Sequence, residues 1–255
     1  AQAREGQRQA TSTSLAGGAA DRLAELAVRV RMVQHLNRLF LREASGARGA
    51  GLAISFPWEA PVGAQRAQAG GWIAGGANRF SVMSVAWGSQ SGVIGSAIAD
   101  SALNLHHENN SPGGAAGELG VFPNRFLDIV SLAYSNALVA SPLVDSDAEI
   151  LEAMLYGAGS LLPRAAQLEN AIEAVGRSLA QVLAHEIGHS LGLQHPEQYV
   201  PGAIMNASPL FSPSRALVFL ASDLQVLQGA LPGAGRVGAV AGKAAAMPAG
   251  GVVVN

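Results

Sequence analysis

Residues 185–195 read His-Glu-Ile-Gly-His-Ser-Leu-Gly-Leu-Gln-His, and the rest of the chain is interpreted outward from them. His185 and His189 are four residues apart, so on a helix both imidazoles leave the same face and can share a metal ion. Glu186 is rotated by about 100° from His185. Its carboxylate can therefore reach a water on that metal without being a ligand itself.

A third imidazole follows after a turn. Gly192 can adopt a left-handed conformation and end the helix, so that the chain turns back and His195 supplies a third nitrogen. Three neutral histidines leave one position open, which is the catalytic rather than the structural arrangement for zinc. The alternative is a helix whose histidines only cap or pack. Three of the six histidines lie here in ligand spacing, which favours the metal site.

The pattern HExxHxxGxxH resembles that of the metzincin zinc endopeptidases, which also carry a methionine in a tight turn beneath the metal. Residues 202–206, Gly-Ala-Ile-Met-Asn, fit this Met-turn, with Met205 ten residues beyond His195. Among metzincins the stretch is most similar to the matrixins, and residues 208–209 and 221–228 resemble a matrixin's wall segment and last helix. The His195–Pro196 pair resembles the serralysins instead, and the tyrosine that both branches have just after the methionine is absent. The resemblance covers about residues 179–230.

The resemblance implies an α+β fold in which a small twisted mixed sheet is joined to a long zinc helix and a C-terminal helix. This chain would add an extra N-terminal helix. The implied activity is that of a zinc-dependent endopeptidase that cleaves proteins or peptides, with Glu186 as the general base. The implied zinc ligands are His185, His189 and His195.

Further site residues follow from the resemblance alone. Met205 would form an apolar floor beneath the ligands. The outer wall of the pocket beside the scissile bond would contain Asn206, Ser208, Pro209 and Leu210. In metzincins an edge strand upstream of the zinc helix holds the substrate backbone, and two segments, Leu119–Phe122 and Ser146–Leu151, compete for that place.

Two other functions remain open. The chain could be a zinc aminopeptidase of the same clan with a closed cleft, or a non-catalytic binding module that keeps zinc as a staple. Glu186 argues against the staple, because a structural ion has no use for a carboxylate beside an open position. Cleavage products separate the peptidases, since internal fragments indicate an endopeptidase and single residues an aminopeptidase.

Composition narrows the possible partners. About half of the 255 residues are hydrophobic, 13% are charged and the net charge is −2, so neither nucleic acid nor an anionic membrane is an implied partner. The chain has no cysteine, which excludes disulfides and thiolate ligands, and no apolar run is long enough to span a bilayer. The chain starts without Met and without an apolar leader, as a secreted enzyme does after processing. We therefore expect an extracellular location.

The chain divides into three parts. Residues 1–20 are expected to be a flexible tail, residues 21–231 a metzincin-like catalytic domain, and residues 232–255 a tail or linker rich in Gly, Ala and Val that could lead to additional domains. Residues 100–120 are polar and include His106 and His107. They are either a solvated loop or a second metal site, for calcium or for a structural zinc ion such as matrixins carry.

Hydrophobic periodicity predicts the elements within the domain. Three helices are expected before the zinc helix and one after it, and five strands are expected between the first two helices. Gly176 is expected to end the third helix, and a Ser178–Gln181 capping box to start the zinc helix at about 179. On that helix Val182 is expected in the cleft with the ligands, and Ile187 in the core. The expected helices are 22–44 with Asp21 as cap, a short one from the Ser146 capping box, 164–175, the zinc helix, and 223–231; the expected strands are 52–56, a hairpin of 80–87 and 93–99, 119–122 and 128–139.

Overall fold

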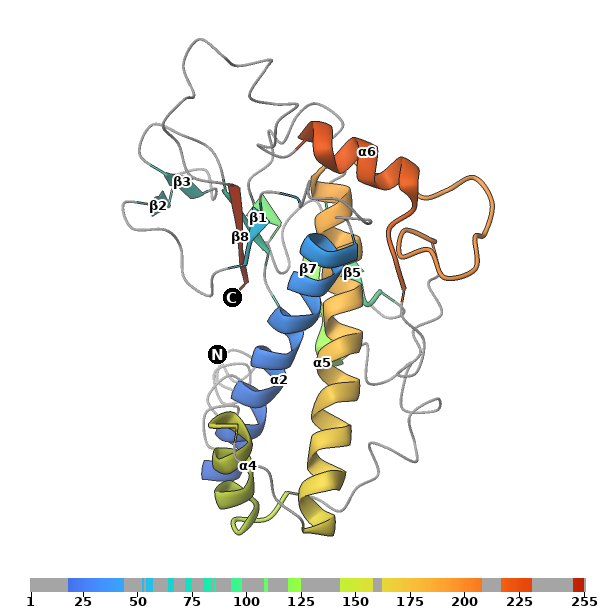
Figure 1. The fold of residues 1–255 in the computed structure, drawn as a ribbon. Helices are drawn as coiled ribbons and strands as arrows, with labels where there is room; N and C mark the ends of the chain where they lie inside the picture. The colour runs from blue at the N-terminus through green and yellow to red at the C-terminus, as the bar shows by residue number, and fades with distance from the viewer. Residues whose placement is uncertain are drawn as a thin grey trace, which may run out of the picture.

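The computed structural model describes residues 18–43, 52, 54–56, 64–66, 72–74, 80–83, 85, 93–97, 108–109, 119–124, 143–157, 162–207, 217–230 and 250–254. Helices and short strands combine in an α+β fold (Figure 1). The helical elements are α2 (Ala19–Asn37), its π-helical continuation η2 (Arg38–Glu43), α4 (Asp147–Leu155), α5 (Pro163–Ser190) and α6 (Ala221–Ala230). Within this part of the chain, no helix is both long and apolar enough to span a bilayer.

Helix α5 is the longest element, with 28 residues, and starts at Pro163, whose missing N–H costs nothing in a first turn. The predicted break at Gly176 is wrong, because the helix runs through it. Gly176 instead allows α2 to approach closely. A Cβ atom there would lie 2.7 Å from Cβ of Arg31 and 3.2 Å from the backbone nitrogen of Met32.

The predicted start of the zinc helix at about 179 is wrong for the same reason. Ser178 and Gln181 lie within α5 and are 0% and 2% exposed, so they form no N-terminal capping box. The core face was predicted correctly, since Ile187 is fully buried. Val182 was placed on the wrong face, because it belongs to the same hydrophobic cluster as Ile187. Both faces of α5 are therefore covered along this part of the helix.

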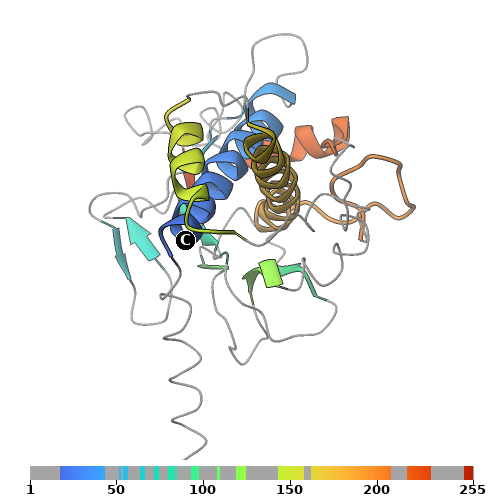
Figure 2. The same cartoon turned by 90° about the horizontal axis from the view of Figure 1, so that it is seen from below.

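Helices α2, α4 and α5 pack against one another (Figure 2), and α4 lies at the end of the molecule far from α6 (Figure 1). A small core of Ala20, Ala27, Leu151, Leu168 and Ile172 joins them. Both predicted helices are present in this bundle, but their capping differs. The carboxylate of Asp21 lies in the first turn of α2 and accepts the Gly18 N–H at 2.8 Å, and Ser146 makes no side-chain capping bond in α4.

The strands are short and form three groups. Four pair in parallel in the order β1 (Ile54–Ser55), β8 (Gly250–Val254), β4 (Phe80–Met83) and β6 (Glu108–Asn109). Strands β2 (Ala64–Arg66) and β3 (Trp72–Ala74) pair antiparallel. Strands β5 (Gly95–Ser96) and β7 (Gly120–Val121) also pair antiparallel, with Val85 bridged in parallel to Val121.

Two strand predictions are corrected by this pairing. The runs 80–87 and 93–99 do not form a hairpin with each other, because β4 pairs with β6 and β8 whereas β5 pairs with β7. Residues 250–254 were expected to belong to a tail or linker but form β8, between β1 and β4. Three consecutive β-branched residues, Val252–Val254, suit a strand.

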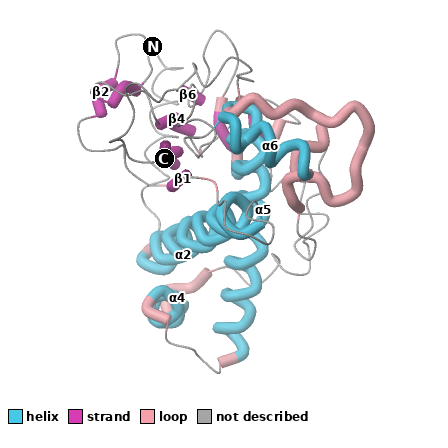
Figure 3. Tube along the Cα trace, turned by 45° about the horizontal axis from the view of Figure 1, so that its top comes forward, coloured by secondary structure: helices cyan, strands magenta, loops and turns pink. Residues whose placement is uncertain are grey.

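A second, larger core lies around the C-terminal half of α5. Figure 3 shows α6 next to this end of α5. Phe40 of η2 is fully buried at its centre, with ring centroids 5.3 Å from Phe56 and 4.9 Å from Phe219. Leu227 brings α6 into the same core, so the closing helix predicted at 223–231 is present at Ala221–Ala230. The end of α5 that carries the histidines is therefore surrounded by packed side chains.

Candidate metal centre

A tight turn at the end of α5 brings the third histidine back to the other two. Gly192 has a φ of +95°, as predicted. Its N–H donates to the His189 carbonyl at 2.9 Å, and the Leu193 N–H donates to the Gly188 carbonyl at 2.9 Å. This pair of bonds is the Schellman motif, in which a glycine satisfies the last carbonyls of a helix. The motif reverses the chain, so that His195 faces the helix it has just left.

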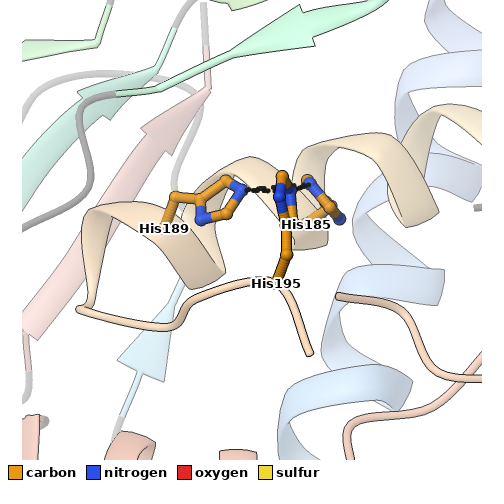
Figure 4. Close-up of side chains that lie close together, drawn as sticks. All are labelled: His185, His189 and His195. Carbon is orange, nitrogen blue, oxygen red and sulfur yellow. Dashed lines mark hydrogen bonds between the residues drawn. The ribbon is translucent and has the colours of Figure 1, made fainter. Parts of the chain in front are cut away.

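The three imidazoles converge on one point (Figure 4). The Nε2 atoms are 3.1 Å apart for His185 and His189, 3.0 Å for His189 and His195, and 3.2 Å for His185 and His195. Tetrahedral zinc with Zn–N bonds of about 2.0–2.1 Å holds neighbouring nitrogens about 3.3 Å apart. The spacing of the three nitrogens therefore fits one zinc ion.

Backbone carbonyls set the tautomer of the two helical histidines. The Nδ1–H of His185 donates to the Ile204 carbonyl at 2.7 Å, and that of His189 donates to the Leu193 carbonyl at 2.9 Å. Each ring then presents an unprotonated Nε2 to the centre of the cluster. Burial lowers the pKa of His185 to about 4, the hydrogen bond to Ile204 opposes that shift, and burial also lowers the pKa of His189. Both rings are neutral at pH 7, as a metal ligand must be.

Glu186 lies beside the cluster and is only 5% exposed. Strand β5 packs directly on its carboxylate, because a Cβ atom on Gly95 would lie 2.5 Å from Oε1. Burial raises the pKa of Glu186 to about 8. A dication bound by the neighbouring imidazoles would lower that pKa again, because it favours the charged carboxylate. Glu186 is thus a carboxyl group that can exchange a proton near neutral pH.

The loop after His195 returns beneath α5. Met205 is fully buried, and a Cβ atom on Gly188 would lie 2.6 Å from its sulfur, so the helix can approach Met205 only because residue 188 is glycine. Asn206 is 3% exposed and its carboxamide is turned into its own loop, where it bonds to the backbone of Val200 and Ala203. The predicted role of Asn206 in a pocket wall stays a prediction, and Ser208, Pro209 and Leu210 lie outside the described residues.

Two segments were predicted to compete as the substrate-binding edge strand. One of them is helical, and the other lies between two neighbours and so is not at an edge. Residues 146–151 belong to α4 and its N-cap. Residues 119–122 include β7, which has β5 on one side and Val85 on the other. Among the described residues β5 pairs only with β7. His106 and His107 lie outside the described residues, so the second metal site stays a prediction.

Sequence reasoning missed three groups at this site, namely Gly95 and the carbonyls of Leu193 and Ile204. The carbonyls belong to every residue type and give no signal in a sequence. Gly95 is one of 31 glycines in the chain. Its only signal is its place in a β-like run, where glycine is unusual and often marks the close approach of another group.

Comparison with known proteins gives one family. Residues 81–229, more than half of the chain, match the sequence profile of the peptidase family described as matrixin. Nothing among curated proteins or solved structures matches the chain. The matched range includes β5, β7, all of α5, the three histidines and nearly all of α6.

Proposed function

Because the chain belongs to the matrixin family of peptidases, we propose that it is a zinc-dependent endopeptidase that hydrolyses peptide bonds within protein substrates. The observation that carries the proposal is the convergence of three Nε2 atoms within 3.2 Å of one another next to a buried carboxyl group. The zinc ligands would be His185, His189 and His195. When bound, zinc would supply Lewis-acid chemistry: it would lower the pKa of a water and stabilise negative charge on the substrate carbonyl.

The proton chemistry belongs to Glu186. Its carboxylate accepts a proton from the water that attacks the peptide carbonyl, and then donates that proton to the nitrogen of the leaving amine as the C–N bond breaks. Burial, which raises the pKa of Glu186 to about 8, and a neighbouring dication, which lowers it, act in opposite directions. A group balanced in this way can both accept and return a proton near pH 7.

The substrate is best accommodated along β5. This strand pairs only with β7 among the described residues, and Gly95 within it touches the Glu186 carboxylate. A peptide added to the edge of β5 that no described strand covers would bring its backbone alongside Glu186 and the histidine cluster. Met205 would form the apolar floor beneath the ligands. Asn206, Ser208, Pro209 and Leu210 would form the outer wall of the pocket.

We propose further that residues 21–231 form the catalytic domain together with β8, since the matched range lies within residues 21–231 and β8 pairs with β1 and β4. An extracellular site of action is consistent with the matrixin family. A calcium or second zinc ion in the 100–120 segment is a separate proposal that the catalytic site does not require.

The first test is cleavage of a peptide library with and without o-phenanthroline. Internal cleavage that the chelator abolishes supports the proposal. Release of single terminal residues would indicate an aminopeptidase, and a lack of cleavage by the zinc-loaded protein would indicate a non-catalytic module.

The second test is Glu186→Gln. This variant keeps the three ligands, so its zinc content should equal that of the wild type, while kcat/KM falls by roughly 10²- to 10⁴-fold, the usual contribution of a general base. Glu197→Gln is the matched control, because Glu197 is exposed in the loop beyond the third histidine, and its activity should be unchanged. Cleavage by Glu186→Gln at the wild-type rate would remove Glu186 from the mechanism.

A further inference from the structure

The loop from Val200 to Asn206 is closed by a single side chain. Oδ1 of Asn206 accepts the Val200 N–H at 3.0 Å, and Nδ2 donates to the carbonyls of Val200 at 2.7 Å and Ala203 at 2.9 Å. Both amide hydrogens and the amide oxygen are thus used. The opposite orientation of the carboxamide would place an oxygen against two carbonyls. The side chain is therefore fixed by three bonds to the backbone of its own loop.

The same loop supplies the carbonyl that orients His185. Ile204 lies between Ala203, which Asn206 contacts, and Asn206 itself. The Ile204 carbonyl accepts the Nδ1–H of His185 at 2.7 Å. On the other side, the Ile204 N–H donates to the Val218 carbonyl at 2.9 Å. Ile204 is fully buried, so water cannot replace either bond. The direction of the His185 ring thus depends on the shape of this loop.

We propose that Asn206 is a positioning residue for the metal centre. Its carboxamide holds the Val200–Asn206 loop in the one conformation that points the Ile204 carbonyl at His185, and that carbonyl keeps the Nε2 of His185 unprotonated and aimed at His189 and His195. The three bonds of the Asn206 carboxamide go to the backbone of its own loop, so it acts on the metal centre through the Ile204 carbonyl and not as a ligand. The inference rests on the proposed function in one respect, namely that the three imidazoles bind zinc.

The chemistry of the side chain explains why asparagine suits this position. Aspartate has no donor for the carbonyls of Val200 and Ala203, and the extra methylene of glutamine would move its amide group away from the position that the Asn206 amide has. Serine can keep one of the three bonds, and alanine none. A loop released in this way leaves the Ile204 carbonyl free to turn from His185, and outer-shell partners of a metal-bound histidine typically change metal affinity by about 10- to 100-fold.

The test compares Asn206→Ala and Asn206→Ser with the wild type. Zinc affinity is measured by competition with a chromophoric chelator, and the visible spectrum of the cobalt(II)-substituted protein reports ligand geometry. We expect zinc affinity to fall on the order of tenfold or more in Asn206→Ala and less in Asn206→Ser. The cobalt(II) spectrum should change in the same order. If Asn206→Ala does not fold, the comparison of Asn206→Ser with the wild type decides the outcome.

Asp147→Asn serves as the matched control. Asp147 is also a buried polar side chain that accepts a backbone N–H, but it lies in α4, far from the histidines. This variant should lower Tm yet keep zinc affinity and the cobalt(II) spectrum. If the Asn206 variants bind zinc as the wild type does, or lose affinity only in proportion to Tm as the control does, the inference is overturned. If the wild type itself binds no zinc, the proposed function fails instead.

Discussion

At Gly95 the backbone of β5 comes so close to α5 that a Cβ atom would lie 2.5 Å from Oε1 of Glu186 and 2.9 Å from its Cγ. No rotation of the terminal carboxylate alone removes both contacts, because Cγ is involved. Any side chain at position 95 would therefore move Glu186 or separate the strand from the helix. A glycine, which has no reactive side chain, thus decides where the carboxylate of Glu186, the proposed general base, lies.

We expect Gly95→Val to lower kcat/KM by at least about tenfold while zinc content stays at the wild-type level. Valine suits a strand, so the variant should fold, but the Glu186 carboxylate is displaced and a shift of about 1 Å is enough for such a loss. Peptide cleavage rates and plasma emission analysis of zinc measure the two quantities.

A double-mutant cycle supplies the control. In the Glu186→Gln background the proposed general base is already removed, so Gly95→Val should cost little further activity. Equal losses in both backgrounds would show that Gly95 acts on substrate binding or folding and not through Glu186.

The residues of the metal cluster were predictable because helical periodicity fixes the directions of side chains. His185, Glu186 and His189 had to leave α5 within one turn, and a left-handed Gly192 had to return the chain. The carbonyls of Leu193 and Ile204 were not predictable, since their positions depend on how a loop folds back on the helix. The close contact at Gly95 depends on the packing of a distant strand and escapes local reasoning for the same reason.

At the scale of elements, the crossing of α2 and α5 depends on Gly176. Alanine there would gain about 1 kcal/mol from helix propensity, but its methyl group would lie only 2.7 Å from Cβ of Arg31 and 3.2 Å from the Met32 backbone nitrogen on α2. Overpacking of this kind costs typically about 1–3 kcal/mol. We expect Gly176→Ala to lower the free energy of unfolding, as measured in urea.

The control is Asn170→Ala, at an exposed position on the same helix, which should leave that free energy equal or slightly higher. A stabilised Gly176→Ala would show that the two helices separate easily.

The contact of α4 with α5 should depend on pH. Arg164 donates to both carboxylate oxygens of Asp147, at 2.9 and 2.6 Å, and these bonds hold the pKa of Asp147 below its ordinary value. The unfolded chain then binds a proton at higher pH than the folded one, so the stabilisation is present above about pH 4 and is lost as the pH falls through the lowered pKa. Tm of the wild type should exceed that of Asp147→Asn at pH 7, and the difference should shrink below pH 4. A constant difference would contradict the ion pair.

The helices could be predicted from apolar periodicity, but their junctions could not. A glycine within a helical pattern predicts an end when only the sequence is known, whereas at Gly176 the helix continues because α2 lies against it. The pairing of the strands was even harder to predict from the sequence. Strand β8 lies between β1 and β4, almost two hundred residues away along the chain, and no local pattern specifies such partners.

At the scale of the whole molecule, α5 joins two cores. Its N-terminal half packs with α2 and α4, and its C-terminal half carries the histidines into the larger core that includes Met205 and Leu227. A metal ion held by the three histidines would tie the helix to the loop after it, because His185 and His189 lie on α5 and His195 lies beyond the turn. A metal bound there should stabilise the second core directly and the three-helix end only through α5.

Removal of the metal should therefore have a local effect. A ligand that binds only the folded state at about 1,000 times its Kd contributes about 4 kcal/mol, so chelation should lower Tm. Hydrogen exchange should rise mainly in residues 191–206, where the Schellman turn and the Asn206 contacts lose the constraint of a shared ion, and much less in α4. Cleavage activity should disappear before the helical circular dichroism does, and added zinc should restore it. A catalytic ion in an already packed core is not needed to hold the distant helices together. Complete unfolding on chelation, with α4 exchanging as fast as the 191–206 loop, would therefore identify the ion as a structural staple.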